Sequence, residues 1–197
     1  MDIQLVLMQA SVFDLLARLY LHRPNQEMVA TFNDVFQELA ESLMLTIEDA
    51  SAGDSVPLLK SDYDDLFFVP VSGRYLPPFE SAQRANRLWG PITYQVADFY
   101  QSVGFDRTNL IVDKHWKNLD APDHIGVELA CMSALLRANA AAPTPEMTNA
   151  IMFFTRQHLT HWLPDYGERV ARYAATSLYH TLGRLTRAFI LDFAEVM

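Results

Sequence analysis

Apolar residues recur along most of this chain at spacings of three and four, the period of one face of an α-helix. The first stripe comprises Leu5, Met8, Val12, Leu15 and Leu19. The last stripe comprises Leu178, Leu182, Leu185, Phe189, Phe193 and Val196. No alternating pattern of the kind that strands show extends over a useful length. The pattern therefore predicts an all-α bundle of roughly eight to ten helices that bury their stripes against one another.

Capping residues mark where two of the early helices begin. Asn25 suits the start of a second helix that runs to about Leu45, because its side chain can accept a bond from the first turn. Ser61, with Asp64 three residues later, resembles a capping arrangement for a short helix over residues 63–68. Both boundaries are predictions from local chemistry.

Prolines and a glycine mark the later boundaries. Pro91 suits the first turn of a helix that Gly104 ends. Thr144 followed by Pro145 is a helix start, with a cap and then a first-turn proline. We expect Pro164 to interrupt that helix or to begin another, because proline removes a backbone donor.

Length and charge set the broad class of the protein. The 197 residues suffice for a single helical domain, 1–197, with two lobes joined near 113–123 as the alternative. The net charge of −9 disfavours a nucleic-acid partner. Ten acids lie within residues 27–65 against one base, and five arginines lie within residues 156–187 against two acids. These runs either solvate outer helix faces or suit a basic peptide.

The N-terminus and the cysteine content bear on location. Asp2 stands where a signal peptide would be basic, and no small-residue cleavage site follows. No run of 18 uncharged apolar residues is present, so we expect no membrane-spanning segment. The single cysteine, Cys131, excludes an internal disulfide and is simplest as a small core residue. The sequence therefore predicts a cytoplasmic protein.

Familiar cofactor motifs are absent from the sequence. None of the seven glycines precedes a lysine, so there is no phosphate-binding loop, and there is no G-x-G-x-x-G. His158 and His161 share a predicted helix, but a third ligand at useful spacing is missing. We expect no metal and no cofactor, and we expect His158 to be a hydrogen-bonded, partly buried histidine.

One segment carries apolar and stiff residues that suit peptide binding. These candidates are Tyr63, Leu66, Phe67, Pro77, Pro78, Phe79 and Ser81. The first three share a helix face, and residues 70–78 form a loop because prolines and Gly73 break the periodicity. These residues either pack the loop onto the core, the reading that the residues alone slightly favour, or form an apolar groove for a peptide.

A second segment carries Asp123, His124 and Glu128. Asp123 is placed to cap the helix that follows, and His124 and Glu128 lie on one face of that helix. One interpretation is a structural cap with an ion pair. The other is an acidic patch with a titratable histidine, suited to binding a cationic group. Use of the same three groups for acid–base catalysis would require a pocket and a substrate.

Together these two segments resemble the TorD/DmsD/NarJ family of redox-enzyme maturation chaperones. The resemblance rests on Tyr-x-x-Leu-Phe at 63–67, Pro-Pro-aromatic-x-Ser at 77–81 and Asp-His at 123–124, supported by residues 15–20 and 158–164. The family pattern often reads Glu-Pro-x-Asp-His, whereas this chain has Asp120-Ala121-Pro122-Asp123-His124. The proline-bearing hinge therefore falls near 120–123.

The resemblance implies an all-helical, non-catalytic chaperone in the cytoplasm. Such proteins bind the twin-arginine leader or the apo form of a molybdoenzyme catalytic subunit, assist cofactor insertion and delay export. A NarJ-like chaperone for a leaderless nitrate-reductase-type subunit is the first alternative, and a non-catalytic helical scaffold is the second. The resemblance also allows a monomer or a domain-swapped dimer.

A leader of this kind would need two kinds of contact. Its two guanidinium groups need carboxylates, and its apolar stretch needs a groove. Asp123, Glu128 and the acidic stretch that ends at Asp65 would supply the charge. Leu66, Phe67, Phe79 and the loop prolines would form the groove. We therefore expect Asp123→Ala and His124→Ala to weaken binding of the client without unfolding the protein.

Overall fold

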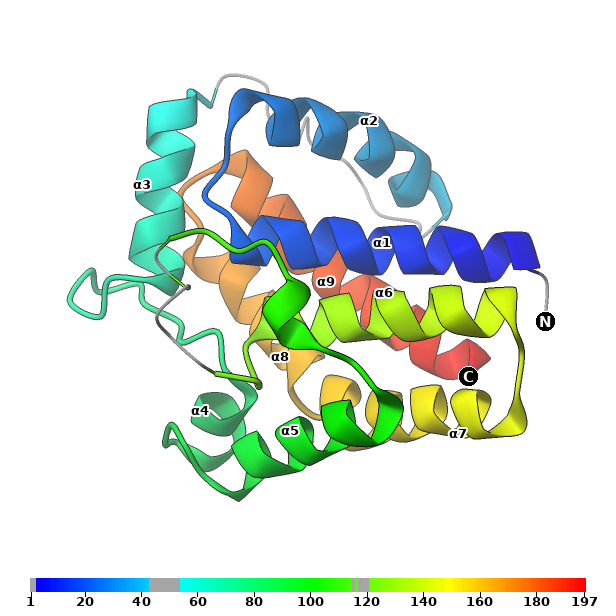
Figure 1. Ribbon diagram of the computed structural model, residues 1–197. Helices are drawn as coiled ribbons and strands as arrows, with labels where there is room; N and C mark the ends of the chain where they lie inside the picture. Colours follow the sequence, from blue (N-terminus) through cyan, green and yellow to red (C-terminus); the bar gives the residue numbers. More distant parts are fainter. Residues whose placement is uncertain (1–2, 43–53, 115, 117–120) are drawn as a thin grey trace. The chain divides into compact units, whose positions relative to one another are not determined.

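The computed structural model describes residues 3–42, 54–114, 116 and 121–197, with the side chains of residues 36–42 left out. Within these residues the chain forms helices and one isolated β-bridge, and no strand (Figure 1). The prediction of an all-α fold with eight to ten helices is confirmed. The predicted end of the second helix near Leu45 lies outside the described residues.

The chain divides into two compact units that are discontinuous in sequence. The first unit comprises Met1–His22, Pro78–His161 and Met197, and the second comprises Arg23–Pro77 and Trp162–Val196. Residues 113–123, where the sequence suggests a joint between two lobes, lie within the first unit. Residues 115 and 117–120 of that segment are outside the described part, so the joint stays a prediction.

The first unit is built on two long helices that run side by side. Its elements are α1 (Ile3–Leu21), α4 (Glu80–Ala85), α5 (Pro91–Val103), η1 (Arg107–Asn109), α6 (Ile125–Ala141), α7 (Pro145–Phe154) and η2 (Thr155–Leu159). Ser133 on α6 donates a hydrogen bond of 2.8 Å to the carbonyl of Ala10 on α1. Gly126 allows the close approach, since a Cβ there would lie 2.4 Å from Leu21 Cγ. The α1 and α6 pair forms the core that carries the Asp123–His124 segment.

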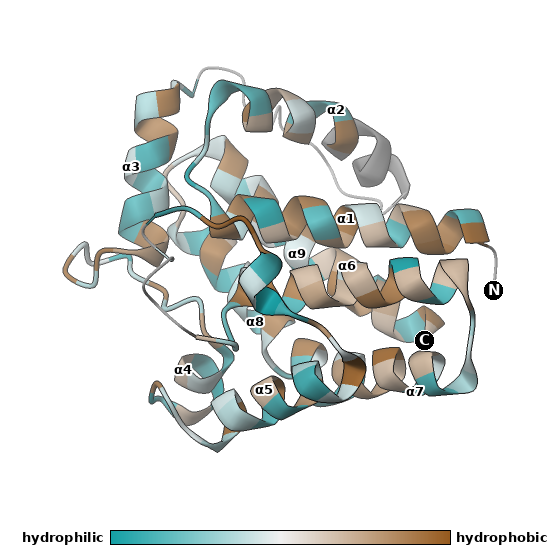
Figure 2. Cartoon of the chain, in the orientation of Figure 1, coloured by the Kyte–Doolittle hydropathy of each residue, from teal (hydrophilic) through white to brown (hydrophobic). Residues whose placement is uncertain are grey.

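Helix α1 is apolar enough to raise the question of a membrane span. Its 19 residues, Ile3–Leu21, meet the length and hydropathy of a spanning segment, and 56% of the tested window is buried inside this structure. Figure 2 shows hydrophobic residues alternating with polar ones along the helix. The core helix of a soluble protein meets the same test, so this is weak evidence for a membrane span.

Several predicted helix ends of the first unit are confirmed. Helix α5 begins at Pro91 and ends at Gly104, which is left-handed with φ 70°. Helix α7 is capped by Thr144, whose side chain accepts a bond from Met147 N, and Pro145 follows it. Local chemistry therefore determined these boundaries.

Helix α8 (Thr160–Tyr173) corrects the expectation for Pro164. The helical path runs from α7 through the π-helical turn η2 into α8, and Pro164 lies inside α8 without ending it. A proline inside a helix removes one backbone hydrogen bond and crowds the preceding turn, and here it lies in a helix that follows directly after the π-helical turn η2, where the regular bonding pattern is already altered. The chain crosses from the first unit to the second between His161 and Trp162, within this continuous helical path.

The second unit contains α2 (Gln26–Ser42), α3 (Val56–Phe67), most of α8, and α9 (Ser177–Val196). Asn25 caps α2 as predicted, because its Oδ1 accepts a bond of 2.8 Å from Met28 N. The cap predicted at Ser61 is wrong, since α3 begins after Ser55 with a proline in its first turn. Ser61 sits in the middle of that helix, where the capping pattern has no function.

A buried carboxylate ties α3 to the start of α9 in the second unit. Asp62 is 1% exposed and accepts hydrogen bonds from Ala175 N, Thr176 N and Thr176 Oγ1 at 2.7–3.2 Å. Arg74 forms an ion pair with the same carboxylate and, at 2.7 Å, with Asp65. Asp62 therefore holds the loop before α9 and the loop after α3 in place.

Candidate functional site

The structure brings together the two sequence segments that carry the candidate residues of the first unit. Phe79 and His124 form an antiparallel bridge, and their ring centroids are 5.4 Å apart. Glu80 N donates to the carbonyl of Asp123, and Ile125 N donates to the carbonyl of Pro78, each at 2.9 Å. Residues 78–81 and 122–125 therefore lie side by side.

Asp123 does not cap its own helix, which corrects the expectation from sequence. Its carboxylate Oδ2 accepts a bond of 2.9 Å from Ser81 N, in the first turn of α4, and the residue is 1% exposed. Ser81 is also fully buried. Asp123 thus anchors the start of α4 and holds the two segments together.

His124 caps α6 instead. Its Nδ1 accepts a bond of 3.1 Å from Gly126 N, so Nδ1 carries no proton and the neutral ring carries its proton on Nε2. The ring lies near Phe79 and Trp116, with a centroid distance of 4.7 Å to Trp116. Burial lowers the pKa of His124 from 6.5 to about 3. The histidine is therefore neutral near pH 7, which disfavours the interpretation of a titratable group in an acidic patch and agrees with a structural cap.

Glu128 is one of three buried carboxylates around Tyr100. Glu80, Asp123 and Glu128 are each at most 1% exposed. Burial raises the pKa of Tyr100 well above 10, and the nearby Cys131 and the three carboxylates raise it further. The Tyr100 hydroxyl donates a bond of 2.9 Å to the carbonyl of Pro122. The cluster is interior, so its carboxylates are not an exposed acidic patch.

Glu80 is a buried residue that the sequence reading did not select. Its Oε2 lies 2.8 Å from Nδ1 of His158, and its Oε1 pairs with Arg84. The predicted hydrogen bond of His158 is confirmed, and the residue, expected to be partly buried, is only 3% exposed. The sequence did offer one signal for Glu80. It lies in the proline-aromatic segment and four residues before Arg84, the spacing of an ion pair on one helix face. The pair joins the start of α4 to the π-helical turn η2.

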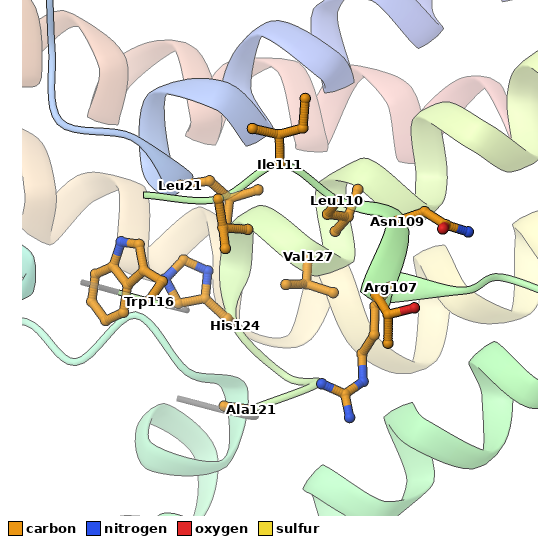
Figure 3. A pocket seen from close by; sticks show the side chains of 11 residues that line it. Leu21, Arg107, Asn109, Leu110, Ile111, Trp116, Ala121, His124 and Val127 are labelled. Atoms are coloured by element: carbon orange, nitrogen blue, oxygen red, sulfur yellow. The ribbon is translucent and has the colours of Figure 1, made fainter. Parts of the chain in front are cut away.

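A cavity of about 560 Å³ lies beside His124 within the first unit (Figure 3). It is lined by Leu21, Arg107, Thr108, Asn109, Leu110, Ile111, Val112, Trp116, Ala121, His124 and Val127. Figure 3 shows Trp116 and His124 at one end of the wall and Arg107 and Asn109 at the other. Most of the wall is apolar, and the volume is in the range of small-ligand sites. Of these residues the sequence indicated only His124, because residues 107–112 carry no recognisable pattern.

The remaining candidates, Tyr63, Leu66, Phe67 and Pro77, belong to the second unit. The first three are at most 1% exposed, and the ring of Tyr63 lies 5.3 Å from Phe67 and 6.1 Å from Tyr179. Leu66 also accepts a bond of 2.7 Å from Leu76 N through its carbonyl. Tyr63, Leu66 and Phe67 are therefore core residues against which the loop 70–78 packs. This agrees with the first of the two interpretations of the segment, in which it packs onto the core.

Metal binding and thiol chemistry find little support in the described residues. Within them no group of three or more His, Cys, Asp and Glu side chains is placed to hold a metal ion. Cys131 is fully buried, and burial followed by the charge of Glu128 raises its pKa far above the usual value. Its thiol is therefore a poor nucleophile.

Comparison with protein families identifies the chain. The family model described as "nitrate reductase delta subunit" matches residues 15–166. The chain belongs to this family. The match includes both candidate segments, at 63–81 and 123–128.

The nitrate reductase delta subunit family is the NarJ/TorD-type chaperone family, so the resemblance from sequence is confirmed. Its members are maturation chaperones that are generally non-catalytic and act with molybdoenzyme subunits. Among curated proteins, no sequence matches this chain significantly.

A solved structure agrees with the fold of this family member. A crystal structure described as that of a proposed redox enzyme maturation protein from Archaeoglobus fulgidus superposes with a TM-score of 0.59 at 17% sequence identity. The alignment covers 92% of this chain and 93% of that chain. At this identity the likeness shows the fold.

Proposed function

We propose that this chain is a chaperone that binds the twin-arginine leader, or another part of the apo form, of a molybdoenzyme catalytic subunit. In this role it assists cofactor insertion and delays export of the client. The observation that carries the proposal is the apolar cavity of about 560 Å³ beside the Asp123–His124 segment. A cavity of this size has room for a few apolar side chains of an extended or helical peptide.

The apolar stretch of the leader occupies this cavity in our proposal. Leu110, Trp116 and Val127 supply apolar contacts from its wall, which His124 also lines. Asp123 acts by holding α4 against the helix start, because its carboxylate is buried and bonded to Ser81 N. Asp123 and Glu128 therefore shape the site, and the arginines of the leader meet other, exposed carboxylates.

The buried residues of the second unit support the proline loop in this proposal. Leu66 holds Leu76 through a backbone bond, and the hydroxyl of Tyr166 donates a bond of 3.0 Å to the carbonyl of Leu76. On the same helix as Leu66, the rings of Tyr63 and Phe67 pack edge to face and are buried. These contacts fix the chain immediately before Pro77 and Pro78, which lowers the entropy lost on binding.

Substitutions in the cavity test the proposal directly. We would measure binding of synthetic twin-arginine leaders, taken from the molybdoenzyme subunits of the same cell, by calorimetry. Val127→Phe should weaken binding about tenfold or more, because it fills the cavity with a ring. Val71→Phe is the matched control, since Val71 is 92% exposed in a turn of the second unit. If both variants lost leader affinity equally, or if neither lost any, the cavity would not be the binding site.

Substitution of Asp123 needs a conservative replacement. Asp123→Ala removes a buried acceptor and should lower the free energy of unfolding by about 1–3 kcal/mol, so the expectation that it weakens binding without unfolding the protein stays a prediction. Asp123→Asn keeps the acceptor for Ser81 N. If Asp123→Asn binds leaders like wild type while Val127→Phe does not, the positioning role of Asp123 is supported.

The two alternative functions predict different clients. A NarJ-like chaperone would bind an intact catalytic subunit that lacks a leader, and would ignore the synthetic leaders. A scaffold would bind neither. The enzyme alternative requires a pocket that encloses Asp123, His124 and Glu128, whereas of these three only His124 lines the cavity. Affinity purification of the tagged chain from its own cells, followed by mass spectrometry, would separate these outcomes.

A further inference from the structure

The connection between α4 and α5 presents large apolar side chains to solvent. Every residue from Arg84 to Trp89 is exposed. Leu88 is 45% exposed and Trp89 is 46% exposed, and Tyr94, in the first turns of α5, is 61% exposed. The other two tryptophans, at 116 and 162, are 7% and 2% exposed. This loop therefore displays the one exposed indole of the described residues.

The backbone of the loop holds the indole in an uncommon conformation. Trp89 has φ 58° and Asn86 has φ 53°, both in the left-handed region. Asparagine tolerates this region, but a bulky residue is rarely found there and costs energy to hold. Gly90 N donates a bond of 3.3 Å to Thr93 Oγ1, which fixes the end of the loop against α5. Trp89 is only partly covered in this conformation, and its carbonyl accepts a bond of 3.5 Å from Arg87 within the same loop.

The charge of the loop differs from the charge of the chain. Residues 84–91 contain Arg84 and Arg87 and no acid, although the whole chain carries a net charge of −9. Charges farther away than about 8 Å are largely screened at physiological salt, so the local positive charge governs a close contact. Arginine beside tryptophan, tyrosine and leucine is the composition of segments that lie at membrane–water interfaces.

The small size of the surface favours a lipid over a protein partner. With about 200 Å² for each large side chain, the exposed fractions of the three leave roughly 300 Å² in contact with water. A stable protein interface needs about 800 Å² from each partner. Peripheral attachment to a bilayer needs only a few apolar anchors and nearby cationic groups.

We propose that this chain docks reversibly on anionic lipid surfaces through the loop 84–91 and the adjoining start of α5, with Leu88, Trp89 and Tyr94 as anchors and Arg87 as the cationic group. Arg84 contributes less, because it is paired with Glu80. Docking of this kind brings the chaperone to the membrane without a spanning segment. It is independent of the peptide-binding proposal, since none of these residues lines the cavity beside His124.

Fluorescence of the full chain with lipid vesicles tests this proposal. We would compare pure phosphatidylcholine vesicles with vesicles that also contain phosphatidylglycerol, each with and without a brominated lipid. Phosphatidylglycerol vesicles should shift the tryptophan emission to the blue and quench it when brominated. The response should weaken as salt is raised. No response, or an equal response to pure phosphatidylcholine, would overturn the proposal.

Matched variants locate the contact. Trp89→Asn keeps a residue that accepts the left-handed backbone while it removes the indole, so the loop should keep its shape. Vesicle sedimentation should show about a tenfold or larger loss of binding for this variant, and a smaller loss for Arg87→Gln. Val71→Asn removes an exposed aliphatic side chain elsewhere and should bind like wild type. Wild-type binding by Trp89→Asn, or attachment that requires a protein partner, would refute lipid docking through this loop.

Discussion

The side chain of His124 has three structural roles: it caps α6, packs against aromatic rings and lines the cavity. The Nδ1 bond from Gly126 N caps α6, and that bond assigns the proton to Nε2. The ring also packs near Phe79 and Trp116 and lines the cavity. A single substitution therefore changes helix stability, packing and the cavity wall together, and interpretation of a His124→Ala variant would be ambiguous.

Substitution of His124 by asparagine or by glutamine separates its capping function from its packing and its place in the cavity wall. Asparagine can place its oxygen near the position of Nδ1 and cap α6, whereas glutamine reaches farther and loses the cap. Both lose the ring. We expect His124→Asn to be more stable than His124→Gln by about 1 kcal/mol in urea unfolding at pH 7. If the glutamine variant were as stable as the asparagine variant, the Nδ1 bond would contribute nothing measurable to the stability of α6.

The lowered pKa of His124 also predicts a pH dependence. Above pH 6.5 the ring is neutral in both the folded and the unfolded protein. As the pH falls from 6.5 toward 3, the unfolded chain gains a proton that the folded protein does not bind. The free energy of unfolding should therefore drop by about 1.4 kcal/mol for each pH unit in this window.

His124→Asn provides the reference for this measurement. Other groups titrate in both proteins, so the difference between the two stability curves isolates the histidine. Urea unfolding at pH 7.5, 6.5 and 5.5 should show wild type losing stability relative to the variant only below pH 6.5. Parallel curves over the whole range would mean that His124 is accessible to protons in the folded state.

At the scale of elements, α8 and α9 cross at a glycine pair in the second unit. A Cβ on Gly183 would lie 2.4 Å from both Ala171 N and Gly167 O, which are backbone atoms. A Cβ on Gly167 would likewise lie 2.6 Å from Gly183 O. Backbone atoms cannot turn aside as a side chain can, so the two helices must separate to admit even one methyl group.

Gly183→Ala should therefore destabilise the protein despite the helix propensity of alanine. In an exposed helix the same change would stabilise by about 0.5–1 kcal/mol. We expect instead a loss of about 1–3 kcal/mol in chemical unfolding, from forced separation of the helices. Gly126→Ala is the comparison, because two of the three close contacts of its Cβ would be with side-chain atoms of Leu21, which can shift more easily than backbone, and it should cost less. A stabilised Gly183→Ala variant would refute the close crossing.

At the scale of the whole molecule, the two units share one discontinuous chain. The chain passes between them after His22, after Pro77 and after His161. The second unit takes α9 and most of α8 from the C-terminal segment and the rest from residues 23–77. Neither unit is therefore a continuous stretch that could be removed from one end without consequence.

The fragment 1–161 tests this dependence. It lacks Tyr179 and the donors at 175 and 176, so the Tyr63–Phe67 cluster and Asp62 lose their partners from α9 and the loop before it. Limited trypsin digestion should cut the fragment after Arg74 much faster than the full chain. If trypsin cut after Arg74 equally slowly in the fragment and in the full chain, residues 23–77 would hold their structure without the C-terminal segment.

What the sequence determined by itself follows from local physics. Helical periodicity, the caps at Asn25 and Thr144, and the stop at Gly104 depend on neighbours within a few residues, so the all-α class and these boundaries were predictable. The family resemblance rested on short motifs that the family match confirmed. The mistaken cap at Ser61 shows the limit of such signals, since the same residues also occur inside helices.

Only the tertiary structure decided what the buried polar residues do. Asp123 bonds across to Ser81, Asp62 to residues 175–176 and Glu80 to His158, at separations of 42 to 114 residues along the chain. Burial sets the charge state of His124, and residues 107–112 line the cavity beside it together with residues from α1 and α6. Partner choice and burial are properties of packing between distant segments, and no local pattern records them.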